Sequence, residues 1–155
     1  MGKSLIDGVK IKTLVSHHDD RGFLMEILRN DDNVLEQFGQ ATISMSHPGV
    51  IKAFHYHDRQ DDAWFFPSGN AQAVLYDLRK DSPTYKETNV FYPGEKNPLL
   101  ILIPHGVAHG YRVLGNQPAT ILYFTTESYD AKNPDEFRVP FDDPDIGFDW
   151  QTQHR

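Results

Sequence analysis

Short runs of alternating apolar and polar residues recur along the chain, and they constrain its fold more than any other feature. Successive side chains of a β-strand point to opposite faces, so such runs are typical of half-buried strands. Turn-forming dipeptides such as Pro48-Gly49 and Pro93-Gly94 separate them. The expected strands are 9–13, 23–27, 41–46, 50–57, 63–66, 71–78, 99–103 and 119–126. Only 33–38 has a pattern typical of a helix, so the sequence predicts an all-β sandwich or barrel.

The composition narrows the chemistry that this barrel can perform. A length of 155 residues favours one domain spanning 1–155. The chain has no cysteine, so any metal must bind through histidine and carboxylate side chains. The net charge of −7 argues against a nucleic-acid-binding protein. No window approaches the ~20 apolar residues of a membrane helix, and the N-terminus does not resemble a signal peptide. We therefore expect a cytoplasmic protein without a membrane partner.

Four of the eight histidines lie in two short segments. His55 and His57 are two residues apart, so both imidazoles point to the same face of a strand, and Asp62 follows them. His109 lies in the second segment, after an apolar run that ends at 103. The order and spacing resemble the two cupin motifs, which are His-x-His with a later acid and glycine, then Pro-x-Gly-x-x-His. The resemblance implies that His55, His57, Asp62 and His109 could bind one divalent metal such as Zn, Fe, Mn or Ni.

Longer motifs between about residue 8 and residue 150 carry a more specific resemblance. They are Asp20-Arg21-Gly22-Phe23 with Glu26, Gly49-Val-Ile-Lys52-Ala-Phe-His55-Tyr56, Asp77-Leu78-Arg79 with Ser82-Pro83-Thr84-Tyr85, Ala108-His109-Gly110-Tyr111, Leu122-Tyr123 with Tyr129-Asp130, and Asp143-Pro144 with Ile146 and Trp150. Together they resemble the dTDP-4-dehydrorhamnose 3,5-epimerase (RmlC) branch of the cupins. This resemblance implies a single cupin jelly-roll domain and a homodimer that exchanges an N-terminal strand.

The same resemblance implies a reaction and the residues that perform it. We expect epimerisation of a nucleotide-linked 4-keto-6-deoxy sugar for cell-surface polysaccharide synthesis, without a cofactor. His55 would be the base that removes the proton next to the ketone, since its ordinary pKa of ~6.5 is close to working pH. Tyr123 would be the acid on the opposite face of the sugar. The residues expected to bind substrate are Arg21, Glu26, Lys52, His109 and Tyr129.

Three departures from the family leave alternatives open. The family usually has Gln where this chain has His57, and Lys where it has Asp62. Both changes favour a metal site, yet a metal-bound His55 could not also be the base. The family's aspartate partner of the base lies in a C-terminal stretch, and we expect this chain to end before it. The alternatives are a metal-dependent isomerase or dioxygenase, or a sugar-binding cupin without activity.

Overall fold

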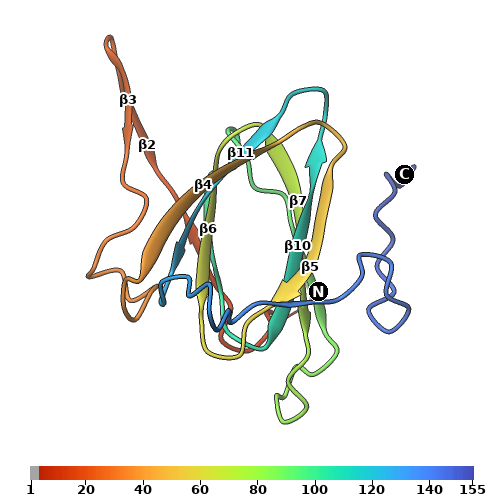
Figure 1. Cartoon of the computed structure of the whole chain (residues 1–155). Helices are drawn as coiled ribbons and strands as arrows, with labels where there is room; N and C mark the ends of the chain where they lie inside the picture. Colours follow the sequence, from red (N-terminus) through yellow and green to blue (C-terminus); the bar gives the residue numbers. More distant parts are fainter. Residues whose placement is uncertain (1–3) are drawn as a thin grey trace.

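Two antiparallel five-stranded sheets face each other in the computed structural model, which describes residues 4–155. The first sheet has the order β1 (Lys10–Thr13), β9 (Leu99–Ile103), β6 (Asp62–Ser68), β11 (Ala119–Thr125) and β4 (Gln40–Ser46). The second has the order β12 (Phe137–Arg138), β5 (Ile51–Tyr56), β10 (Val107–Leu114), β7 (Asn70–Asp77) and β8 (Thr88–Phe91). The first sheet is on the left of Figure 1 and the second on the right. This is the predicted cupin jelly roll.

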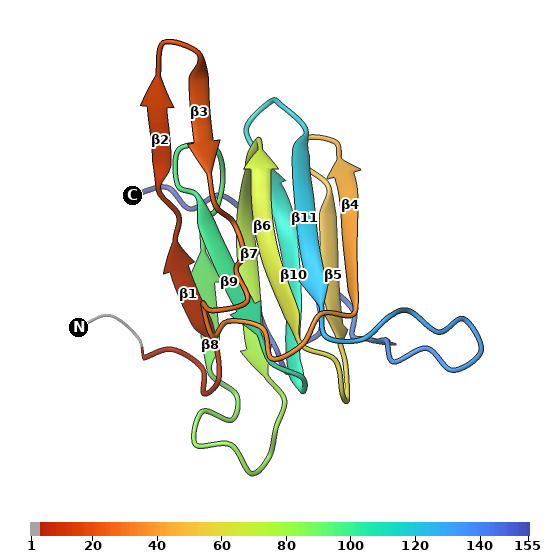
Figure 2. The same ribbon diagram turned by 90° about the vertical axis from the view of Figure 1, so that its left-hand side faces the viewer.

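A hairpin of β2 (Ser16–Asp19) and β3 (Gly22–Met25) forms a separate two-stranded sheet. It projects beyond the end of the first sheet, as Figure 2 shows most clearly. Its side chains Phe23 and Leu24 are 67% and 64% exposed. A two-stranded hairpin without packing partners is marginally stable in water. Association that covers these apolar side chains would therefore stabilise the hairpin.

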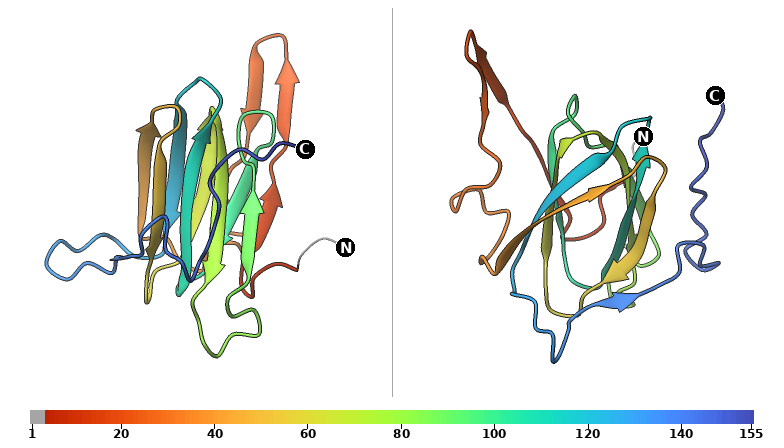
Figure 3. Two further views of the ribbon diagram at one scale, coloured as in Figure 1. Left: turned by 90° about the vertical axis from the view of Figure 1, so that its right-hand side faces the viewer. Right: turned by 45° about the horizontal axis from the view of Figure 1, so that its top comes forward.

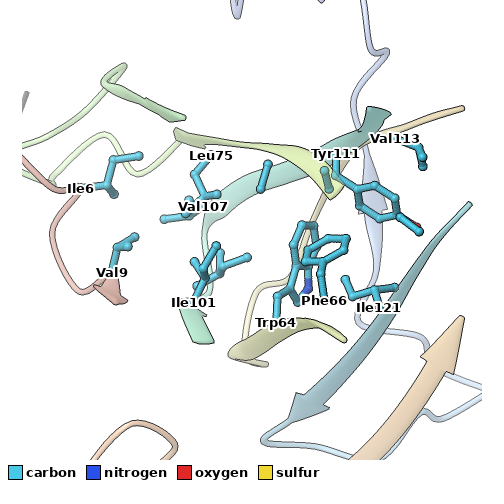
Figure 4. Close-up of a cluster of buried hydrophobic side chains, with 14 residues drawn as sticks. Ile6, Val9, Trp64, Phe66, Leu75, Ile101, Val107, Tyr111, Val113 and Ile121 are labelled. Carbon is cyan, nitrogen blue, oxygen red and sulfur yellow. The ribbon is translucent and has the colours of Figure 1, made fainter. Parts of the chain in front are cut away.

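The main apolar core lies between the two sheets, and a smaller apolar cluster covers the outer face of each. Trp64, Phe66 and Tyr111 meet edge to face inside the barrel, with ring centroids 5.3 to 6.2 Å apart, and Figure 4 shows the three rings together. On the outer face of the second sheet, Phe54 packs against Trp150 of the C-terminal segment. That segment runs across this face on the left of Figure 3. Aromatic side chains therefore attach the C-terminal segment to this face.

The prediction of a helix at 33–38 is wrong. These residues form bends, with Asn33 in the left-handed region at φ 53° and Val34 packed in the outer cluster of the first sheet. A six-residue helix is far shorter than the roughly 12 residues that a helix needs for stability of its own, so packing determines the conformation. Strand β2 was not expected, because its largely exposed Ser-His-His-Asp sequence has no apolar alternation. Within residues 4–155, no helix is long and apolar enough to cross a membrane.

An irregularity in β5 changes which side chains enter the barrel. His55 pairs with His109, yet Lys52 pairs with Tyr111, so β5 has one residue more than β10 over this interval. Such a bulge reverses the alternation of side chains, which lets Lys52 and His55 line the same cavity. Gly110 accommodates the bulge, because a Cβ there would lie 2.3 Å from the Cβ of Ala53.

Asp77 is fully buried at the end of β7 and organises the turn that follows. Its carboxylate accepts hydrogen bonds from the Arg79 backbone and side chain, from the Ser82 hydroxyl at 2.6 Å and from the Thr84 hydroxyl at 2.7 Å. Burial alone would raise the pKa of Asp77, but these hydrogen bonds lower it to about 2. The ionised form therefore stabilises the fold above the ordinary pKa of aspartate.

We expect Asp77→Asn to lower the free energy of unfolding by about 2 kcal/mol at pH 7, since the native structure lowers the pKa of the carboxyl to about 2. The difference from the wild type should shrink as pH falls from about 4 towards 2, where the native carboxylate is also protonated. Urea denaturation across this pH range measures it. The matched control is Asp81→Asn in the same turn, an exposed residue that should change stability little. An equal loss at pH 2 and pH 7 would contradict the prediction.

Candidate active site

A cavity of about 510 Å³ opens between the two sheets, within the range of small-molecule sites. Its walls come from β4 and β11 of the first sheet, from β5 of the second, and from the segment 127–136 that joins β11 to β12. Trp64 and Tyr111 belong to both the cavity wall and the barrel core. The packed aromatic rings therefore close the inner end of the cavity.

Three histidines and one carboxylate meet in and beside this cavity. His55 and His57 come from β5 and the residue after it, Asp62 begins β6, and His109 lies on β10. One potential ligand atom of each residue lies within 4.8 Å of those of the other three. The His55 ring meets the His109 ring edge-on, with centroids 4.2 Å apart. The two cupin-like segments are therefore brought together, as the sequence predicted.

Backbone carbonyls fix the orientation of two of these rings. Nδ1 of His57 is hydrogen-bonded to the carbonyl oxygen of Asp135, and Nδ1 of His109 to that of Val107 at 2.8 Å. A carbonyl oxygen can only accept, so each Nδ1 carries a proton. Each Nε2 then faces the carboxylate of Asp62, at 3.5 Å from His57 and 3.6 Å from His109. In the neutral rings these Nε2 atoms are lone-pair acceptors.

The Asp62 carboxylate is 2% exposed and is surrounded by polar groups. The Gln60 amide donates to it at 2.8 Å and the Trp64 indole N–H at 3.3 Å. Burial alone would raise the pKa of Asp62, but His109 and His57 hold it well below its usual range. Burial also opposes protonation of His57, yet Asp62 and the Asp135 carbonyl raise the pKa of His57 above its ordinary value.

His55 differs from its two neighbours. Among residues 4–155, its side chain has no hydrogen-bond partner. Burial lowers the pKa of His55 well below its ordinary value, and the neighbouring His109 and His57 lower it further against the opposing effect of Asp62. The imidazole is therefore neutral at pH 7, which is the state that a proton-accepting base requires.

The other predicted site residues separate into two groups. Tyr123 on β11 and Lys52 on β5 line the cavity, and so does Tyr129 beyond the end of β11. Burial raises the pKa of the Tyr123 hydroxyl, so it is protonated at pH 7 and can donate a proton. Arg21 and Glu26 do not line this cavity. Arg21 is at the tip of the projecting hairpin, where its 85% exposed side chain pairs with Asp19.

Sequence reasoning missed Asp135, which connects the segment 127–136 to the histidine cluster. Its carboxylate accepts the backbone N–H groups of Asp58, Arg59 and Gln60 at 2.8 to 3.0 Å, while its carbonyl orients His57. The contact spans more than 70 residues, and no local pattern indicates it. The polar wall of β4 had a readable signal. Gln40, Thr42 and Ser44 alternate with apolar residues that point outward.

Comparisons with known proteins agree with this architecture. The sequence model of the family described as dTDP-4-dehydrorhamnose 3,5-epimerase matches residues 3–155. The chain is 65% identical over 151 residues to the spore coat polysaccharide biosynthesis protein SpsL of Bacillus subtilis (strain 168), covering 97% of this chain and 100% of that protein. It is similar to a crystal structure of a dTDP sugar isomerase from Desulfovibrio desulfuricans G20, with a TM-score of 0.87 and 29% identity over 94% of this chain and 92% of that one.

A second similar structure contains a bound nucleotide sugar. It is the dTDP-6-deoxy-D-glucose-3,5-epimerase RmlC from Legionella pneumophila Philadelphia 1 in complex with dTDP-4-keto-L-rhamnose. Its TM-score is 0.85 and its identity 28%, over 98% of this chain and 83% of that one. These likenesses confirm the jelly-roll fold that the sequence predicted.

We expect Asp135→Ala to loosen the loop at 58–60, since it removes three hydrogen bonds to a carboxylate. Losing such partners costs about 1–3 kcal/mol, so these amides should exchange with solvent about 5- to 150-fold faster than in the wild type. Hydrogen exchange followed by mass spectrometry measures this, with the exposed Asp142→Ala as the matched control. Unchanged exchange at 58–60 would contradict the role of Asp135.

Proposed function

Because this chain belongs to the dTDP-4-dehydrorhamnose 3,5-epimerase family, we propose that it epimerises a nucleotide-linked 4-keto-6-deoxy sugar by proton transfer next to the ketone. The similar SpsL protein is named for spore coat polysaccharide biosynthesis, and we place the product of this chain in polysaccharide synthesis as well. We also place the reaction in the cytoplasm, which is compatible with a chain without cysteine.

One observation carries the proposal, namely that His55 and Tyr123 line the same cavity from opposite sheets. His55 is on β5 of the second sheet and Tyr123 on β11 of the first. A sugar ring between the sheets therefore has the base at one face and the acid at the other. Epimerisation needs this arrangement, because removal and return of the proton on one face would restore the original configuration.

The proton transfer follows from the protonation states of the two groups. Neutral His55 accepts the proton from the carbon next to the ketone, and the electron pair of the broken C–H bond moves towards the ketone oxygen. Tyr123, which is protonated at pH 7, donates a proton to the opposite face of that carbon. The pKa values of the two groups are displaced in opposite directions, downward for His55 and upward for Tyr123, because the protein partly removes both from water.

The cavity has few positive charges to bind a nucleotide diphosphate. Two cationic side chains, Lys52 and Arg59, line the cavity together with five carboxylates. Arg59 is already 3.5 Å from Glu127. A diphosphate therefore needs a further cation. Arg21 does not line the cavity of its own chain, since it lies in the turn between β2 and β3.

A second copy of the chain would supply that cation and cover the exposed apolar surface. The outward side chains Ile43 and Met45 of β4 are 68% and 51% exposed, while the other face of β4 lines the cavity. This apolar outer face and the exposed Phe23 and Leu24 of the hairpin are surfaces that association would bury. We propose a homodimer in which the hairpin of one copy packs on β4 of the other, so that its Arg21 completes the partner's cavity.

We expect His55→Asn and Tyr123→Phe to separate the two halves of the reaction. Without the base, incorporation of solvent deuterium next to the ketone should fall by about 10³-fold, a typical contribution of general base catalysis. With Tyr123→Phe, deuterium should still enter through His55 but the configuration should be retained. NMR of nucleotide 4-keto-6-deoxy sugars in deuterated water measures both outcomes. Full exchange in His55→Asn would exclude His55 as the base.

The proposed dimer predicts recovery of activity in mixed dimers. Co-expressed Arg21→Ala and His55→Asn chains form heterodimers in which one cavity has an intact His55 and an intact Arg21 from the partner. These should regain about half of the wild-type activity, as one of two symmetry-related sites is restored. The matched control is co-expression of His55→Asn with Tyr123→Phe, which places one defect in every cavity and should recover nothing. Absence of recovery in the first mixture would contradict a site shared between copies.

A further inference from the structure

We propose that His57, Asp62 and His109 bind one divalent transition-metal ion, of the class that includes zinc and manganese, and that His55 remains free beside it. The location of the ion follows from contacts within the chain. Its catalytic use rests on the function proposed above. In that reaction a bound cation would supply positive charge where the resembling family carries a lysine.

The buried space around the Asp62 carboxylate holds an excess of hydrogen-bond acceptors. The Nε2 atoms of His57 and His109 face opposite oxygens of one carboxylate, and both rings have their Nδ1 protons committed to backbone carbonyls. His109 is 1% exposed, and its Nε2 has no hydrogen-bond partner among the described residues. The Nε2 of His57 has the Gln60 amide as a donor at 3.5 Å. A proton on His57 would satisfy its contact with Asp62 and still leave His109 unpaired. A single cation satisfies all three groups.

The spacing of these atoms also fits ligands of a shared ion. The separations of 3.5 and 3.6 Å exceed the 2.7–3.2 Å of ordinary N–H···O hydrogen bonds. Ligands that bind one ion at about 2.0–2.1 Å lie roughly 3.0–3.4 Å from one another, depending on the geometry. The observed spacing is therefore close to that of ligands around a shared ion, and a small movement of the side chains would complete the site.

Further hydrogen bonds already hold these three side chains in place. Metal-binding histidines usually donate their other N–H to a carbonyl or carboxylate, and ligating carboxylates accept further hydrogen bonds. His57 and His109 have such carbonyl partners in Asp135 and Val107. Gln60 and Trp64 donate to the Asp62 carboxylate.

His55 lacks this support. It is close enough to be a ligand, yet no group within residues 4–155 orients its ring by a hydrogen bond. Three protein ligands of the type His, His and carboxylate form a known open metal site, which leaves positions for other ligands. Assigning His55 to the base and the other three residues to the ion removes the conflict between the two roles.

The test uses the full chain after removal of metals with a chelator and dialysis, titrated with zinc ions by isothermal calorimetry. We expect one ion per chain. His57→Gln and Asp62→Asn should each weaken binding by at least about 100-fold, since replacing even an outer partner of a ligand costs 10–100-fold. His55→Asn should bind zinc within a few-fold of the wild type. The control is His105→Gln, an exposed histidine outside the cluster, and its affinity should not change.

Two results would overturn the proposal. Wild-type affinity in both His57→Gln and Asp62→Asn would exclude these ligands, and a loss in His55→Asn as large as in Asp62→Asn would make His55 a ligand. Deuterium exchange on the same samples keeps the two proposals distinct. If the chelated protein binds no added zinc but still exchanges deuterium, the metal site is excluded and the proposed epimerase reaction stands. Stoichiometric zinc binding without exchange of any 4-keto sugar would support the metal site and contradict the proposed reaction.

Discussion

The buried carboxylate of Asp62 is the group on which the arrangement of the site depends. A charge that is 2% exposed is costly unless neighbouring groups compensate it. Four side chains surround it, two histidines, an amide and an indole, and they come from β6, β10 and the 57–60 segment. Asp135 holds that segment in place from a position more than 70 residues later in the chain. The electrostatics of one residue therefore join both sheets and the segment that borders the cavity.

The irregular part of β5 determines which chemistry this environment can support. A regular strand would place Lys52 and His55 on opposite faces, whereas the bulge directs both into the cavity. Phe54 lies in the outer cluster beneath Trp150, so the same distortion is anchored by apolar packing. Tyr123 enters from the opposite sheet. The position of His55 and Tyr123 on two sides of one cavity, which the proposed base and acid require, is thus a property of the two-sheet architecture.

Much of the fold and of the candidate site could be predicted from the sequence. The features that could not be predicted share one cause, which is their dependence on tertiary packing. The alternation around His55 and His57 predicted their shared face, and the motif around His109 predicted that the two segments meet. The sequence also predicted most strands of the jelly roll. Sequence reasoning could not locate the bulge, because it depends on close packing of Ala53 against Gly110. The contact of Asp135 and the irregular conformation of 33–38 likewise depend on tertiary packing.

The most direct test of the account is a crystal structure of the chain with a bound nucleotide 4-keto-6-deoxy sugar. The account predicts the sugar ring between the two sheets, with an imidazole nitrogen of His55 and the Tyr123 hydroxyl on opposite faces of the carbon next to the ketone. Each should lie roughly 3–3.5 Å from that carbon, the separation of reacting atoms in a productive complex. A sugar that contacts His55 and Tyr123 on the same face, or that binds outside this cavity, would contradict it.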